Sequence, residues 1–268
     1  MTKFAVIGAG MMGSAIITGV IEKKVLAPEE IMISDPDTAK TESLCAKLGV
    51  ASAGSNAEAV KDADAVLIAV KPQFLGGALE ELNGNLSPDA LVMSIVAGVP
   101  VCRYSETLGT GRVIRVMPNT PAQVGEGVCG WFAAYGVSAE QKEFAEKILS
   151  ALGFAFEVKR ESDLNLVTAV SGSGPAYVFL FIEAMTDAAV QLGLPRPLAH
   201  KIVLQTVFGS AAYMKQTGKH PVILKNEVTS PGGTTAAALW MMEKEGLRTA
   251  LTDGMIACLE KTIELGKK

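Results

Sequence analysis

The stretch that decides the fold of this 268-residue chain is Val6-Ile7-Gly8-Ala9-Gly10-Met11-Met12-Gly13. It follows the end of a short apolar run, Phe4 to Ile7, and it opens a helical pattern, Ala15 to Lys24. The three glycines have G-x-G-x-x-G spacing, which permits a tight turn, a close approach of the backbone to a pyrophosphate, and close packing of the helix on the strand. We therefore expect the residues from Gly8 to Gly13 to bind a dinucleotide. A purely structural glycine-rich turn is the alternative.

Short apolar runs continue through the first 160 residues and alternate with helical patterns such as Thr38 to Leu48. Five runs predict parallel strands buried on both faces: Phe4 to Ile7, Ile31 to Ser34, Ala65 to Ala69, Leu91 to Ile95 and Val113 to Met117. Two further strands, Gly127 to Ala133 and Ala155 to Lys159, flank a predicted helix, Ala139 to Leu152, that Gly153 ends. This alternation is typical of an α/β fold with an open, doubly wound Rossmann-type sheet.

After about residue 160 the strand-like runs give way to helical periodicity. We therefore expect a Rossmann domain over residues 1–160 and an all-helical domain over residues 161–268. One helix carries a stripe of mostly small residues between Ala199 and Met214, and the last carries a stripe between Leu247 and Leu265. Such stripes suit close helix packing within the domain or across a subunit interface, so this is a candidate dimerisation domain.

The composition of the chain argues against nucleic acids, metal ions and membranes as binding partners. The net charge is −4 and no block of basic residues occurs, so we expect no nucleic-acid partner. Four widely spaced cysteines and two histidines predict no metal site, and reduced thiols suit a cytoplasmic location. Glycines interrupt the apolar run Phe4 to Ile21, and the run Ala90 to Cys102 is too short to span a bilayer, so we expect no membrane segment.

The second predicted strand ends at Ser34-Asp35, 22 positions beyond Gly13. In such folds this position distinguishes a free ribose hydroxyl from a 2′-phosphate. Asp35 would accept hydrogen bonds from the hydroxyls of NADH, whereas Ser34, Thr38 and Lys40 could contact the phosphate of NADPH. A third interpretation is that Asp35 only caps the following helix together with Asp37, so the sequence leaves NADH and NADPH open.

Three loops follow predicted strands at the edge where a ligand of this fold lies: Val70-Lys71-Pro72, Val96-Ala97-Gly98 and Pro118-Asn119-Thr120-Pro121. Their prolines and glycines are either plain turn residues or the wall of a nicotinamide site. Lys71 either contacts the cofactor or is simply a solvent-exposed charge.

Two motifs stand out in the helical half. Ser171-Gly172-Ser173-Gly174-Pro175-Ala176-Tyr177 places two glycines and a proline in a helical run, which indicates close approach of a ligand or of another helix. Ser230-Pro231-Gly232-Gly233-Thr234-Thr235 precedes a helical pattern, Ala236 to Glu245. Hydroxyls and bare amides at a helix start favour a site for a carboxylate-sized anion, with a simple Thr or Ser N-cap as the alternative.

Taken together, these motifs resemble the pyrroline-5-carboxylate reductase family, which reduces the cyclic imino acid 1-pyrroline-5-carboxylate to L-proline with NADPH or NADH. The resemblance covers nearly the whole chain and rests on the glycine motif and on Ala69-Val70-Lys71-Pro72, Met117-Pro118-Asn119-Thr120-Pro121, Ser171-Gly172-Ser173-Gly174-Pro175-Ala176-Tyr177 and Val228-Thr229-Ser230-Pro231-Gly232-Gly233-Thr234-Thr235.

The resemblance implies cofactor contacts from Ser34, Asn56, Ala69, Val70, Lys71 and Pro72, to which the strand-end argument adds Asp35 and Ala97. It implies that Ser230, Gly233 and Thr234 hold the substrate carboxylate and that the Thr235 hydroxyl bonds the ring nitrogen. It also implies a homodimer through the helical domain, often assembled further, with each site built from both subunits. The chain departs from some members at Asp35, where others have a neutral residue, and at Glu227, where some have Asn.

No His or carboxylate lies within these motifs, so we expect the substrate to bind as an iminium or to take its proton from water through Thr235, the catalytic candidate. A related imine reductase or a hydroxy-acid dehydrogenase is the alternative enzyme. Such dehydrogenases place a lysine early in the second domain, and this chain has none between Lys159 and Lys201. A non-catalytic nucleotide sensor would leave the Ser230 to Thr235 motif unexplained.

Overall fold

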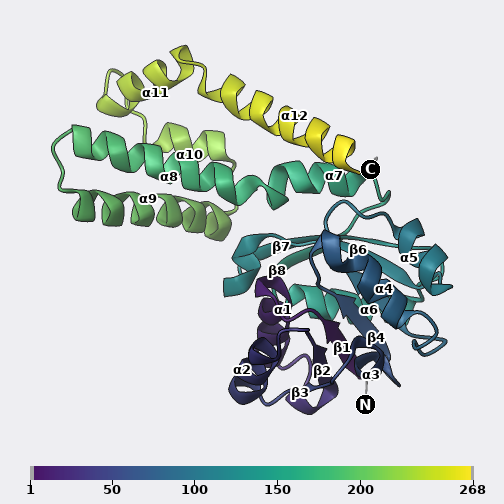
Figure 1. Cartoon of the computed structure of the whole chain (residues 1–268). Coiled ribbons are helices and arrows are strands. Elements are labelled where there is room, and N and C mark those ends of the chain that lie inside the picture. Colours follow the sequence, from purple (N-terminus) through teal and green to yellow (C-terminus); the bar gives the residue numbers. More distant parts are fainter. Residues whose placement is uncertain (1–2, 267–268) are drawn as a thin grey trace. The chain divides into compact units, whose positions relative to one another are not determined.

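The computed structural model describes residues 3–266, which form two compact units. One unit contains the described chain up to Ser173 together with the residues from Cys258 onward, and the other is Gly174–Ala257 (Figure 1). The first unit carries the sheet and the second consists of helices.

The first unit is built on one eight-stranded sheet with the order β3-β2-β1-β4-β5-β6-β7-β8. The strands are β1 (Phe4–Ile7), β2 (Ile31–Ser34), β3 (Ala51–Ser52), β4 (Ala65–Ile68), β5 (Leu91–Ser94), β6 (Val113–Met117), β7 (Gly127–Ala133) and β8 (Gly153–Glu157). Every neighbouring pair is parallel except β6 and β7, which are antiparallel. Because β1 lies between β2 and β4, the strand order reverses there, which confirms the predicted doubly wound Rossmann-type sheet.

Helices cover both faces of the sheet: α1 (Met11–Glu22), α2 (Thr38–Leu48), α3 (Asn56–Val60), α4 (Leu75–Leu82), α5 (Val101–Leu108) and α6 (Ala139–Ser150). Alternate residues of β1 enter different cores, since Phe4 and Val6 pack with α1 and α6, whereas Ala5 and Ile7 pack with α3, α4 and α5. Strands β1, β4 and β5 are buried at every residue, which is why they are almost entirely apolar.

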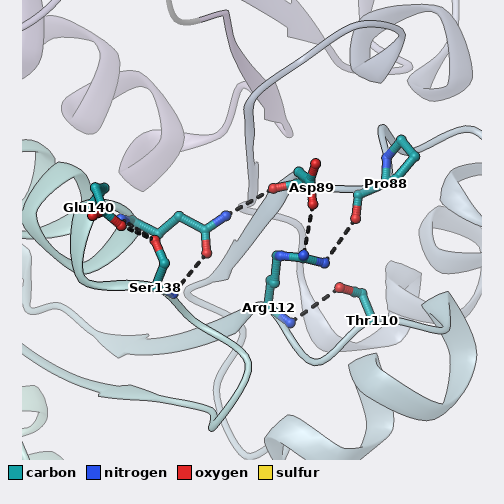
Figure 2. Close-up of polar contacts among 7 residues, drawn as sticks. Pro88, Asp89, Thr110, Arg112, Ser138 and Glu140 are labelled. Atoms are coloured by element: carbon teal, nitrogen blue, oxygen red, sulfur yellow. Dashed lines mark hydrogen bonds and ion pairs between the residues drawn. The ribbon is translucent and has the colours of Figure 1, made fainter.

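Hydrogen bonds tie the start of α6 to the loops that lead into β5 and β6 (Figure 2). Ser138 and Gln141 form a capping box at this helix, and Gln141 Nε2 donates to Asp89 O at 2.9 Å. Arg112 donates to Asp89 Oδ1 at 2.7 Å and to Pro88 O at 3.0 Å. These hydrogen bonds stabilise the amino ends of β5 and β6. The loops predicted to line the ligand site follow the carboxyl ends of the same strands.

The structure corrects three details of the sequence prediction. The strand predicted at Ala155 to Lys159 is β8, which begins at Gly153, and this glycine has φ +137° and a Cβ there would collide with the backbone of Gly127. Gly153 therefore serves strand pairing, whereas α6 already ends at Ser150. The sequence also missed β3 and α3, because two exposed residues and a five-residue helix carry no apolar period.

The chain continues in helices: α7 (Asp163–Val167), a π-helical turn η4 (Thr168–Gly172), α8 (Gly174–Gln191), α9 (Arg196–Thr217), α10 (Pro221–Glu227), α11 (Thr234–Lys244) and α12 (Leu247–Leu265). The predicted helical character of the C-terminal part is confirmed. Among the described residues of the second unit only Thr186, Ala199 and Val203 are buried. Large apolar side chains on these helices stay exposed, including Phe179, Leu180, Phe208 and Trp240.

The 29-residue helical run Asp163–Gln191 has the length and composition of a membrane span. One such helix is weak evidence for a membrane, because core helices of soluble proteins pass the same test of length and composition.

Candidate cofactor and substrate sites

The three glycines of the first motif have distinct surroundings. Gly8 has φ +107°, and a Cβ there would lie 2.7 Å from the carbonyl oxygen of Ala69 at the end of β4. A Cβ on Gly13 would collide with the carbonyl oxygen of Gly8, whereas one on Gly10 would meet nothing within 4 Å. Gly8 and Gly13 are therefore required by packing, and Gly10 leaves space open in front of the helix.

Gly10 is the N-cap of α1, and no side chain caps this helix. Its first backbone N–H groups have no intrahelical partner, and together with the helix dipole they suit a pyrophosphate. Met11 at this end is 76% exposed, while Met12 packs partly against the core. The arrangement has the form that a dinucleotide requires.

Asp35 links the end of β2 to the glycine turn. Its Oδ2 accepts the N–H of Ala9 at 2.8 Å, and its Oδ1 accepts the N–H of Asp37 at 2.9 Å. The capping interpretation named Asp35 and Asp37 together, and the structure places Asp37 alone at the N-cap of α2, where neither side chain caps the helix. Asp37 instead pairs with Lys40 at 3.0 Å, and the hydrogen bond from Lys40 lowers the pKa of the Asp37 carboxyl.

A cavity of about 490 Å³ opens at the carboxyl ends of β1 and β2. It brings together five of the predicted cofactor residues: Gly8, Ser34, Asp35, Asn56 and Val70. Its other lining residues are Ile7, Pro36, Gly54, Ser55, Ala57, Phe74, Gly77, Ala78 and Glu81.

The remaining predicted cofactor residues lie outside this lining: Ala9, Gly10, Met11, Met12, Gly13, Ala69, Lys71, Pro72 and Ala97. Those of the glycine motif form the turn and the start of α1, next to Ala69. Lys71 and Pro72 are exposed at the turn after β4, and Ala97 is exposed in the loop after β5. All of them thus follow parallel strands at the same edge of the sheet.

Several lining residues were not predicted. Gly54 and Ser55 follow β3, and the Ser55 hydroxyl caps α3 by accepting the N–H of Glu58 at 3.2 Å. Phe74, which is 63% exposed, and Glu81 come from the segment after β4. The available signal was the Gly76-Gly77 pair in an otherwise helical segment, since a bare helix face suits close approach of a ligand.

Asn119 connects the loop after β6 to the glycine-rich segment that precedes α8. Its Nδ2 donates to the carbonyl oxygen of Ser171 at 3.2 Å and to the Ser171 hydroxyl at 3.1 Å, and its Oδ1 accepts the N–H of Val128 at 2.9 Å. A Cβ on Gly172 would lie 2.6 Å from Met117 Cε. Gly172 thus makes room for the Met117 side chain of β6, a contact that neither alternative drawn from the sequence named.

The Ser230 to Thr235 motif forms a turn followed directly by α11. Gly233 N–H donates to Ser230 O at 3.0 Å, and Gly232 has φ +69°, as a type II turn with Pro231 before it requires. The helix begins at Thr234, earlier than predicted, and its N-cap is Gly233. No side chain caps it, so the simple Ser or Thr N-cap is wrong.

The predicted substrate residues therefore share one helix start. Ser230 and Thr234 are exposed and Thr235 is half-buried. Within the described part of the chain, none of these three hydroxyls makes a hydrogen bond. Amides and hydroxyls are thus available together for a carboxylate.

Comparison with known proteins places this chain. A family model described as pyrroline-5-carboxylate reductase dimerisation matches residues 161–265, and one described as NADP oxidoreductase, coenzyme F420-dependent, matches residues 3–98. The chain is 43% identical to the pyrroline-5-carboxylate reductase of Synechocystis over 99% of both chains, and 41% identical to that of Escherichia coli over 99% of this chain and 98% of the other. The chain belongs to the pyrroline-5-carboxylate reductase family.

Solved structures agree with this membership. A pyrroline-5-carboxylate reductase from Coxiella burnetii matches with a TM-score of 0.94 and 36% identity over 98% of both chains. The pyrroline carboxylate reductase of Plasmodium falciparum with NADP bound matches with a TM-score of 0.85 and 33% identity, over 99% of this chain and 98% of the other. The resemblance inferred from the sequence motifs is confirmed, and the chain is an NAD(P)H-dependent oxidoreductase. The roles of the individual site residues stay predictions.

Proposed function

We propose that this chain reduces 1-pyrroline-5-carboxylate to L-proline with NADH or NADPH, the last step of proline biosynthesis. The observation that carries the proposal is the identity of about 40%, over almost the whole chain, to pyrroline-5-carboxylate reductases of several organisms. Two helix starts that suit anions, one in each unit, agree with a cofactor that carries phosphates and a substrate that carries a carboxylate.

The glycine turn and α1 fit the pyrophosphate of such a cofactor, because Gly10 leaves open space in front of uncapped amides. The cavity beside Ser34 and Asn56 would receive the adenosine end. When bound, the reduced nicotinamide supplies the hydride that the carbon of the C=N bond accepts.

The start of α11 would hold the substrate. Its amides and the hydroxyls of Ser230 and Thr234 would bind the carboxylate, so no buried cation is needed. The Thr235 hydroxyl would bond the ring nitrogen and pass it a proton from water, or would orient an iminium already protonated in solution. The protein's main contribution is then orientation of two bound reactants, which can account for several kcal/mol of the barrier.

We further propose that the chain is a soluble, cytoplasmic homodimer. The second unit buries three of its described residues and exposes many large apolar ones, so it gains stability when a partner covers them. The family model described as pyrroline-5-carboxylate reductase dimerisation matches these helices, including the run Asp163–Gln191. A contact between subunits would therefore account for their exposed apolar side chains without a membrane.

The test follows the loss of reduced-nicotinamide absorbance with 1-pyrroline-5-carboxylate as the second substrate. Saturable turnover with L-proline as the product supports the proposal, and absence of turnover with both cofactors overturns it. Thr235→Val, which removes the hydroxyl at nearly constant volume, should lower kcat roughly 10- to 100-fold, while Thr235→Ser should retain most of it. Unchanged kinetics for Thr235→Val would remove Thr235 from the mechanism.

A further inference from the structure

The carboxylate of Asp35 occupies a defined position at the adenosine end of the proposed cofactor cavity. Both of its oxygens accept backbone N–H groups, from Ala9 at 2.8 Å and from Asp37 at 2.9 Å. The two strand ends are also joined directly, because Gly8 N–H donates to Ser34 O at 2.8 Å. The side chain cannot swing away without breaking its bond to the glycine turn. Its remaining lone pairs can accept two hydroxyl groups.

The charge of the cavity has one sign. Asp35 and Glu81 are the ionisable residues of the lining, and neither a Lys nor an Arg is among the described residues that line it. Lys40 lies on the helix that follows, but its Nζ is held by Asp37 at 3.0 Å. A 2′-phosphate in this cavity would therefore face two carboxylates, and Lys40 is already paired with one of its neighbours.

We infer that Asp35 is the specificity-determining residue of the cofactor site and makes NADH the preferred reductant. Asp35 accepts hydrogen bonds from the adenosine ribose hydroxyls and repels a 2′-phosphate, while its bond to Ala9 keeps the glycine turn in place. This inference rests on the proposed function for the location of the cofactor, and it decides between the two cofactors that the sequence left open.

A first experiment needs no variant. AMP and adenosine 2′,5′-bisphosphate are compared as inhibitors competitive with NADH, and Kd values for NADH and NADPH are measured by cofactor fluorescence. We expect NADH and AMP to bind roughly tenfold or more tightly than their 2′-phosphorylated counterparts, with the difference shrinking as salt is raised. Equal affinities, or tighter binding of the 2′-phosphates, would overturn the inference.

Asp35→Asn removes the charge but keeps a side-chain oxygen for the N–H of Ala9. It should raise the ratio of kcat/KM for NADPH to kcat/KM for NADH at least about tenfold, mainly through KM. Glu80→Gln is the control, since it makes the same change of charge at an exposed residue of α4 outside the lining. An unchanged ratio in Asp35→Asn, or an equal shift in Glu80→Gln, counts against Asp35.

The binding measurements separate this inference from the proposed function. A chain that binds NADH in preference to NADPH but does not reduce 1-pyrroline-5-carboxylate would overturn the proposed reaction and leave the role of Asp35 intact. A chain that reduces 1-pyrroline-5-carboxylate faster with NADPH than with NADH at limiting cofactor would support the proposed reaction and overturn the role of Asp35.

Discussion

Replacement of Asn119 by Ala should destabilise the sheet-bearing unit by about 2–4 kcal/mol. Asn119 is 8% exposed and makes three hydrogen bonds, two to Ser171 and one from the N–H of Val128. The truncation leaves the Val128 N–H of β7 without its acceptor, which costs about 1–3 kcal/mol. Each lost hydrogen bond to Ser171 adds about 1 kcal/mol, and water that replaces Asn119 in these bonds reduces this second cost.

Urea unfolding followed by circular dichroism measures this loss, at one protein concentration because subunit association contributes to apparent stability. Ser171→Ala is the matched control: it removes one acceptor but leaves the backbone carbonyl that Asn119 also contacts, so it should cost less than about 1 kcal/mol. A loss below about 0.5 kcal/mol in Asn119→Ala, or equal losses in the two variants, would refute the account of Asn119 as the connection between β7 and the segment before α8.

Two further predictions concern Gly10, Gly13 and Cys129. Gly10→Ala should fold like the wild type, because Gly10 has φ −71° and free space around a Cβ, but it should bind the reduced cofactor at least about tenfold more weakly. Gly13→Ala should lose about 1–3 kcal/mol of stability, because its Cβ collides with the backbone of Gly8. Isothermal titration and thermal melts check both, and normal cofactor affinity in Gly10→Ala would count against the pyrophosphate site. Burial raises the pKa of the Cys129 thiol from 9.0 to about 12. As the pH rises above 9, this thiol therefore ionises in the unfolded chain while it stays protonated in the folded one. Its contribution to the free energy of unfolding should fall by about 1.4 kcal/mol between pH 8 and pH 10, and Cys129→Ala should show a correspondingly smaller fall; parallel pH profiles would contradict this.

Much of the sheet was predictable because its physics is local. Strands β1 and β2 have the predicted bounds, since each is a run of apolar residues buried on both faces. The glycine motif was equally informative: Gly8 and Gly13 are required by contacts with backbone only a few residues or one strand away. Strand β3 has two exposed residues and is held by pairing with β2, so its own sequence contains no signal for it.

The candidate site was less predictable because it depends on contacts between segments far apart in the chain. The sequence placed Asp35 at the strand end, but only the structure shows that its carboxylate binds the N–H of Ala9, 26 residues away. Similarly, the spacing of Gly172 indicated a close contact without naming its partner, and that partner, Met117, lies on β6. Periodicity identifies which face of an element is buried, but not which residue of a distant element lies against it.

The choice of glycine at the starts of α1 and α11 connects local structure to binding. Gly10 and Gly233 are the N-caps of these helices, whereas Ser55 and Ser138 cap α3 and α6 with their hydroxyls. A serine cap satisfies one of the free amides of a helix, but the same hydroxyl would compete with a ligand for that amide. Glycine costs only a few tenths of a kcal/mol relative to such a cap, and a bound anion satisfies the amides in its place. Stability that a side chain supplies in α3 and α6 is thus left for cofactor and substrate to supply in α1 and α11, so both ligands should raise the free energy of unfolding.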